Sequence, residues 1–205
     1  FRCQEIAENP LNLTGWIQGT GYTGENGVEI FLADHSAQTL WNVIIEDQRV
    51  SPVGLGARDT LRLEKGYLLS GQDFLWPEIG GAEGFPAGFL ARTTVETAVP
   101  FGLDLSHDFV GKAPLVTSMK SGTRLWGMKC MGKGPSPRAG HAVLNGPGED
   151  ARIVGYVTSG APSPSLGMTG IAMGYLSDCK DGSEVWIQSS TRRRVGSKVL
   201  APPFL

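Results

Sequence analysis

The chain has 205 residues, of which 40% are hydrophobic and 19% are charged, a composition typical of a folded globular protein. The formal net charge is -2, which excludes the strong basic field that attracts nucleic acids or acidic membranes. No run of residues approaches the roughly 18 apolar residues that a membrane span needs. We therefore expect no nucleic-acid partner and no membrane. The 29 Gly and 13 Pro favour a β-rich, turn-rich fold.

The cysteines bear on the compartment. Cys3, Cys130 and Cys179 form no CxxC pair and are odd in number, which argues against a disulfide framework and against a metal site such as a zinc knuckle. A reducing compartment fits this usage, so we expect the cytoplasm, or the mitochondrial matrix if the organism is eukaryotic. The sequence shows no signal peptide. Because Phe1 is not an initiator Met, we expect that further residues precede it.

The beginning of the chain predicts a hairpin. Residues 11–17 predict a short strand, residues 19–27 a turn rich in Gly and Thr, and residues 28–32 a second strand with alternating faces. Gly19 and Gly21 resemble the start of a dinucleotide-binding fingerprint, but the later glycines do not complete its spacing. A hairpin is also not the strand-to-helix context that this fingerprint requires.

Two helices are expected next. Asp34 or Ser36 is placed to cap a helix whose apolar side chains lie within residues 40–45. A second helix is expected over residues 57–65, and Gly66 occupies the position of its C-cap. Helices beside a hairpin in the first part of the chain, followed by strands in the rest, indicate an α+β fold class.

Residues 75–92 interrupt this regular pattern. They are rich in Gly and Pro, show no periodicity, and include Trp76, Phe85 and Phe89. A loop of this length is either functional or mobile. Its aromatic side chains lead us to expect that it packs on another part of the protein.

From Thr93 onward, short apolar segments alternate with tight turns at the spacing of an antiparallel barrel or sandwich. A joint between two domains is placed over residues 92–115. The basic run of residues 192–194 lies between two of the segments, so we expect it at the rim of a hairpin; the alternative is a contact with an anion or a partner protein. The six expected strands cover residues 124–130, 143–145, 153–159, 171–176, 184–189 and 195–200.

Tyr22 and Glu29 are candidates for binding a flat heterocycle. The Gly-rich turn lets the backbone approach a ligand closely, and Tyr22 would offer an aromatic face. The carboxylate of Glu29 could accept two hydrogen bonds from an amino-pyrimidine edge. The alternative is a plain hairpin with an exposed Glu.

Arg58 is a third candidate, because a guanidinium binds a carboxylate bidentately. The alternative is an ion pair between Arg58 and a nearby acid, Asp59 or Glu64. No familiar catalytic constellation is found, and the three histidines lie in unrelated contexts. The residues alone therefore leave the catalytic groups unknown.

Several motifs, taken in chain order, resemble the glycine cleavage T-protein (aminomethyltransferase) family. GYTGENGVEI at residues 21–30 resembles the family's central motif, and LGARDTLRLEKG at residues 55–66 resembles its helix motif. Gly71-Gln-Asp73 stands where the family has Gly-Asn-Asp. Ordered agreement over many motifs is more specific than any one of them. Further matches follow at residues 94–96, 108–112, 137–138, 155–160, 163–166, 172–175 and 202–204.

The resemblance implies a cloverleaf of three domains with tetrahydrofolate in the central hole. Residues 1–92 would form part of the folate-binding α+β region, with an inserted loop near residues 75–92. Residues 93–114 would connect it to a jelly-roll-like antiparallel β-barrel over residues 115–205.

The same resemblance implies roles for the three candidates. Tyr22 and Glu29 would line the folate site, and Arg58 would lie near its substrate or folate end. The family's catalytic Asp belongs to an N-terminal part that the chain does not contain, because only the C-terminal half to two-thirds of a member is represented. We therefore expect that the full-length protein is an enzyme. The 205-residue chain is expected to be a fragment that lacks the catalytic Asp.

The implied activity moves a one-carbon unit from an aminomethyl group on a lipoyl-bearing carrier protein to tetrahydrofolate, with release of ammonia. Two alternatives stay open. One is a folate-dependent demethylase on the same fold, which the loop of residues 75–92 allows. The other is a non-catalytic folate-binding or scaffold module.

Overall fold

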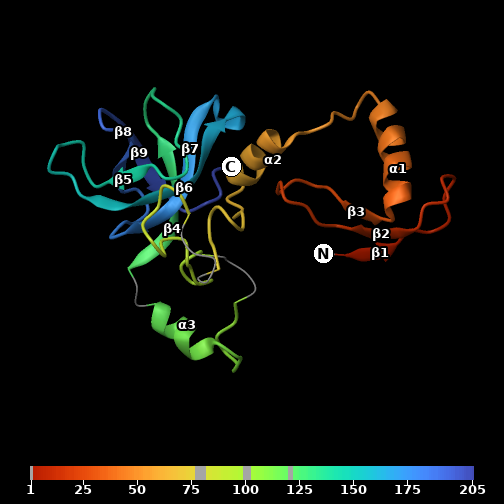
Figure 1. The fold of residues 1–205 in the computed structure, drawn as a ribbon, viewed down its shortest axis with the longest axis horizontal. Helices are drawn as coiled ribbons and strands as arrows, with labels where there is room; N and C mark the ends of the chain where they lie inside the picture. The colour runs from red at the N-terminus through yellow and green to blue at the C-terminus, as the bar shows by residue number, and fades with distance from the viewer. Residues whose placement is uncertain (1, 77–81, 99–102, 120–121) are drawn as a thin grey trace. The chain divides into compact units, whose positions relative to one another are not determined.

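The computed structural model describes residues 2–76, 82–98, 103–119 and 122–205. The chain divides into two compact units, residues 1–62 and residues 63–205 (Figure 1). In the described part of the chain, no helix combines the length and the apolar character that crossing a membrane requires.

The first unit contains a three-stranded antiparallel sheet in the order β1-β2-β3. The hairpin expected from the sequence is confirmed as the pair β2–β3, in which Ile17 lies opposite Ile30 and Trp16 opposite Phe31. Strand β1, which pairs with β2, was not predicted. The elements are β1 (Cys3–Glu5), β2 (Gly15–Gln18), β3 (Glu29–Leu32) and α1 (Asp34–Glu46).

Helix ends differ in part from expectation. Neither Asp34 nor Ser36 caps α1: its N-cap is Ala33, whose side chain makes no capping hydrogen bond, and Ser36 is buried within the first turn. Helix α2 (Leu55–Glu64) begins two residues earlier than predicted. Gly66 ends it as expected, with a left-handed φ of +74° and an N–H that donates to the carbonyl of Leu63 at 2.9 Å.

The second unit is built on a closed antiparallel barrel in the order β4-β7-β6-β5-β8-β9 (Figure 1). The six predicted strands are all confirmed, with ends that shift by up to a few residues. A short helix, α3 (Lys112–Ser118), precedes the barrel. The strands are β4 (Thr123–Cys130), β5 (Ala142–Leu144), β6 (Ile153–Ser163), β7 (Thr169–Ser177), β8 (Glu184–Ser190) and β9 (Arg193–Leu200).

Both faces of β7 are buried. Alternate residues of a strand point to opposite sides of the sheet. Ala172 and Leu176 belong to a cluster to which all six strands contribute, and this cluster fills the barrel. Ile171, Met173 and Tyr175 belong to a second cluster on the outer face, against which Phe89 and Phe204 pack.

The loop expected over residues 75–92 packs against that outer face through Phe85 and Phe89, as predicted from its aromatic content, whereas Trp76 is largely exposed. Phe85 and Phe89 stack with ring centroids 5.6 Å apart. The ring of Phe89 meets Tyr156 edge-on at 5.1 Å and Tyr175 at 6.1 Å. The loop closes where the Leu75 N–H donates to the carbonyl of Leu90. Residues 77–81 of the expected loop lie outside the described residues.

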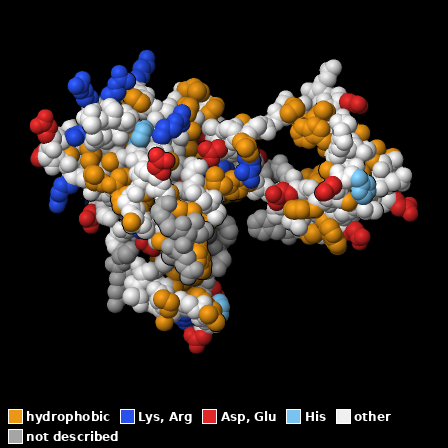
Figure 2. Space-filling model, viewed as in Figure 1, with side chains coloured by type: hydrophobic (Ala, Val, Ile, Leu, Met, Phe, Trp, Pro, Cys, Tyr) orange, Lys and Arg blue, Asp and Glu red, His pale blue; other side chains and the backbone are white. Residues whose placement is uncertain are grey.

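The basic run forms the rim of a hairpin, as expected. Arg192 is in the turn between β8 and β9, and Arg193 and Arg194 begin β9. Arg194 donates to the carbonyl oxygen of Pro147 at 2.7 Å. Figure 2 shows Lys and Arg side chains gathered over one end of the barrel.

The domain limits at residues 92 and 115 stay a prediction. Within the second unit, Leu63, Leu68 and Phe89 pack against the barrel. The mixed α+β class and the antiparallel barrel are confirmed.

Candidate functional site

Tyr22 and Arg58 are brought together in the first unit. Tyr22 lies in the turn that follows β2, and Arg58 lies in the first turn of α2. The Arg58 guanidinium carbon stands 4.4 Å from the centroid of the Tyr22 ring. This is a cation–π contact between a half-buried ring and an exposed cation.

The acids that the sequence offered as partners for Arg58 are engaged elsewhere. The carboxylate of Asp59 accepts from Arg62, with the Nη2–Oδ1 distance at 2.6 Å. Glu64 is buried and accepts hydrogen bonds from Ser163 and Ser165. Arg58 therefore keeps its charged end at the surface beside Tyr22, where an anionic group can reach it.

Glu29 is the first residue of β3 and is exposed. Its Oε2 accepts a hydrogen bond from the hydroxyl of Thr20, on the other side of the turn. This bond occupies one acceptor position of the carboxylate and fixes its direction, while the other oxygen stays available for a donor. Glu29 thus lies in the predicted hairpin, a position that fits both a ligand-binding role and the alternative of a plain exposed Glu.

Tyr22, Glu29 and Arg58 thus supply an aromatic ring, a carboxylate acceptor and a guanidinium within the first unit. A flat, amino-substituted heterocycle that carries an acidic tail needs these three kinds of group. The residues present fit such a ligand. Among the described residues no cluster of three His, Cys, Asp or Glu side chains is placed to hold a metal ion.

Asp73 and Glu64 are buried carboxylates of the second unit that the sequence analysis did not name as site residues. Asp73 accepts from the hydroxyls of Thr158 and Ser159 at 2.5 and 2.7 Å, and from the Leu69 N–H at 2.9 Å. Burial opposes ionisation of Glu64, but hydrogen bonds from Ser163 and Ser165 outweigh it and hold the pKa of that carboxyl below its usual range. Both acids tie the segment before the loop to the barrel.

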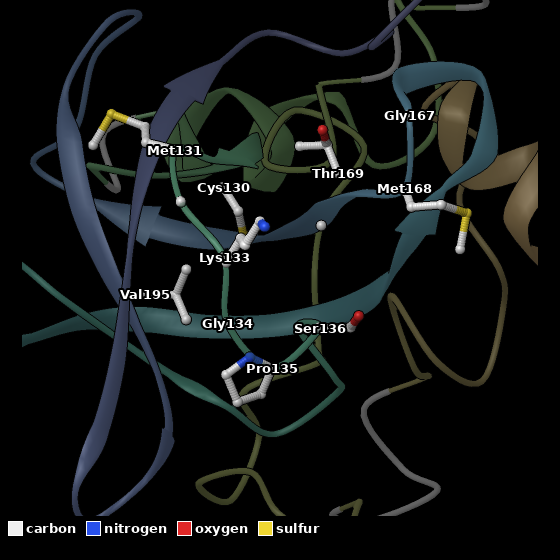
Figure 3. A pocket seen from close by; sticks show the side chains of 12 residues that line it. Cys130, Met131, Lys133, Gly134, Pro135, Ser136, Gly167, Met168, Thr169 and Val195 are labelled. Atoms are coloured by element: carbon white, nitrogen blue, oxygen red, sulfur yellow. The ribbon is translucent and has the colours of Figure 1, made fainter.

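A cleft of about 380 Å³ opens beside the end of β4 (Figure 3). It is lined by the segments 130–136 and 167–170, with Val195. Lys133 is the one charged side chain of this lining, and Met131 and Met168 stand on opposite sides of it (Figure 3). None of the candidate residues from the sequence lies in this cleft.

Comparison with protein families gives two matches in this chain. Residues 2–77 match the model described as the GCVT N-terminal domain. Residues 123–205 match the glycine cleavage T-protein C-terminal barrel domain, which agrees with the barrel observed over the same residues.

Relatives with similar sequences carry the name aminomethyltransferase. The protein from Thermosynechococcus vestitus is 40% identical over 175 residues, which cover 82% of this chain and 42% of the relative. The protein from Oceanobacillus iheyensis is 34% identical over 208 residues, which cover 97% of this chain and 50% of the relative. The chain therefore spans about half the length of such relatives.

A solved structure agrees with the fold. The crystal structure of glycine cleavage system aminomethyltransferase T from Bartonella henselae matches 93% of this chain and 49% of its own, with a TM-score of 0.75 and 29% sequence identity. The motifs, the barrel, the two domain models and the relatives all agree, and the chain belongs to the glycine cleavage T-protein (aminomethyltransferase) family.

Proposed function

We propose that this chain supplies one wall of a tetrahydrofolate site in an aminomethyltransferase of glycine cleavage. The observation that carries the proposal is the placement of Arg58 over Tyr22, with Glu29 directed by Thr20 on the same turn. Membership of the family supports it. When bound, tetrahydrofolate would accept the one-carbon unit.

Each residue has a distinct task in this proposal. The Glu29 carboxylate accepts hydrogen bonds from the amino-pyrimidine edge of the pterin and so sets its orientation. The guanidinium of Arg58 covers one face of the Tyr22 ring, and Tyr22 would pack on the folate or form a hydrogen bond with it. Arg58 also offers its remaining N–H groups to a carboxylate of the folate or to the reacting group.

The one-carbon donor would be an aminomethyl group on the lipoyl arm of a carrier protein, and ammonia would leave. Most of the rate enhancement would come from positioning the two reactants. The acid that assists the transfer is expected in the part of a full-length family member that this chain does not cover. The residues of this chain would therefore bind and orient the folate.

The test is a calorimetric titration of the 205-residue chain with 5-formyltetrahydrofolate, a folate that resists oxidation. Glu29→Ala should lower the affinity by about tenfold or more, roughly 1.4 kcal/mol, because the pterin edge loses its acceptor. Glu5→Ala is the matched control, since Glu5 is an exposed carboxylate on strand β1 of the same sheet. Equal affinities for the parent chain and Glu29→Ala would remove Glu29 from the site.

A folate-dependent demethylase is the second candidate, and the packed loop around Phe85 and Phe89 is the observation that favours it. The full-length protein should release ammonia from a carrier loaded with the aminomethyl group. Turnover of methylated sulfur or nitrogen donors without that release would establish the demethylase instead. Binding of folate with neither activity would identify a scaffold module.

A further inference from the structure

A second cleft, of about 550 Å³, lies in the second unit, where the loop meets the strand ends of the barrel. Phe89 and Tyr156 give it aromatic walls, in edge-to-face contact with each other. Arg92 and Tyr175 line it as well. None of these four residues takes part in the folate site proposed above.

Two buried polar atoms of this lining have no hydrogen-bond partner among the described residues. They are the hydroxyl oxygen of Tyr175 and Nε of Arg92. They belong to side chains in direct contact, because the Arg92 guanidinium carbon lies 4.5 Å from the centroid of the Tyr175 ring. Leaving a buried donor unpaired is unfavourable, so an acceptor is expected beside them.

Both unpaired groups act as donors. Nε of an arginine carries a proton and cannot accept. Burial raises the pKa of the Tyr175 hydroxyl far above its ordinary value, and the nearby Asp73 and Glu96 carboxylates raise it further against the effect of Arg92. The hydroxyl therefore keeps its proton, and the partner that completes this pair must present an oxygen or nitrogen acceptor.

The charge around the pair selects against an anion. Arg92 is already neutralised by Glu96, with Nη1 and Oε1 3.0 Å apart and both side chains about nine-tenths buried. Asp73, also buried, adds a negative charge that Tyr175 senses. At this buried end Arg92 therefore offers no unbalanced positive charge to a carboxylate or phosphate, and a neutral acceptor fits better.

We propose that this cleft binds a small, neutral, flat apolar molecule whose carbonyl or amide oxygen accepts hydrogen bonds from Tyr175 and Arg92. The apolar body would lie against Phe89 and Tyr156, and the acceptor would reach the buried end. Two walls of the cleft, Phe89 and Arg92, come from the loop that the sequence analysis singled out. The loop and the barrel together therefore form the ligand site.

Benzamide is a suitable probe, because it joins an aromatic ring to a neutral amide oxygen, and benzoate has nearly the same shape with a negative charge. The ¹⁵N-labelled 205-residue chain is titrated with each by NMR. We expect benzamide to shift the amide signals of residues that line the cleft, and to bind at least fivefold more tightly than benzoate. Equal binding of the two probes would overturn the charge argument and with it the proposal.

Tyr175→Phe removes the hydroxyl and keeps the ring, and should weaken benzamide binding about fivefold, the effect of one lost hydrogen bond. Tyr67→Phe is the matched control, because Tyr67 is a tyrosine of the same unit that does not line the cleft, and it should leave the affinity unchanged. The spectra themselves report whether each variant is folded. Unchanged binding by Tyr175→Phe, or no shifts up to about 10 mM benzamide, would show that the two donors serve only a buried water.

Discussion

The carboxylate of Glu64 accepts a 2.5 Å hydrogen bond from the hydroxyl of Ser163, although 99 residues separate the two in the chain. Ser165 adds a second hydroxyl at 2.8 Å and its N–H at 3.2 Å. Glu64 is the last residue of α2, where the partial negative charge of the helix end disfavours a carboxylate. The three donors offset that disadvantage and join the helix end to the loop after β6.

This relationship predicts a pH-dependent stability. The pKa of Glu64 is lowered in the folded protein, so its ionised form stabilises the fold above the unfolded value of about 4.3. That contribution is lost as the pH falls from about 4.3 through the lower folded pKa. Glu64→Gln should cost about 1–2 kcal/mol in urea unfolding at pH 7, and the difference from the parent should shrink below pH 4. A difference that stays constant with pH would contradict the assignment.

Asp73 should be among the most sensitive polar positions of the second unit. Asp73→Ala leaves the buried hydroxyls of Thr158 and Ser159 without their acceptor, so the free energy of unfolding should fall by about 3 kcal/mol. Asp108→Ala is the control, because its fully exposed carboxylate makes only a surface ion pair with Lys112. Thermal unfolding of both variants measures the contrast, and similar midpoints would argue against the buried network.

Glycine is required at position 155, where β6 pairs with β7. A Cβ on Gly155 would lie 1.9 Å from the carbonyl oxygen of Tyr175, which belongs to the neighbouring backbone and cannot move aside. Gly155→Ala should therefore destabilise the barrel by about 3 kcal/mol. Gly132→Ala, with open space around the same atom, should change the unfolding midpoint little. Tolerance of Gly155→Ala would mean that the two strands are farther apart than described.

The first unit should open more readily than the second. Leu13 is the one buried apolar side chain among its described residues, whereas Trp16, Phe31 and Trp41 are each about half exposed. Backbone amides of β2 and β3 should exchange with solvent faster than those of β4 to β9. Hydrogen exchange followed by mass spectrometry of the 205-residue chain measures both sets. Equal protection would contradict this ranking.

The barrel strands could be predicted from the sequence, because each is a short apolar segment that ends at a turn. That pattern depends on local residue chemistry. The hairpin around Tyr22 and Glu29 could be predicted in the same way. The sequence could not show that Arg58 turns to Tyr22, because Asp59 and Glu64 are equally near in the chain and only the packed structure assigns them to other partners.

The cap of α1 was missed for a related reason. Asp34 has the chemistry of a cap but lies one residue inside the helix, so Ala33 occupies the cap position. The cleft lined by Tyr175 and Arg92 could not be predicted from the sequence either. Its two donors are 83 positions apart in the chain, and they meet only because the loop folds back onto β7. The only hint in the sequence was the long loop with aromatic residues, which predicted that the loop packs on the protein but not that a cleft forms there.

The first and last segments of the second unit are in contact with each other. The N–H of Phe204 donates to the carbonyl of Glu64 at 2.9 Å, and Pro202 lies against Gly66. The segments around Glu64 and Phe204 are therefore neighbours in space, although nearly the whole barrel lies between them in the chain. Because its two ends meet, the stretch of residues 64–204 could be exchanged as a single piece for the equivalent stretch of another family member.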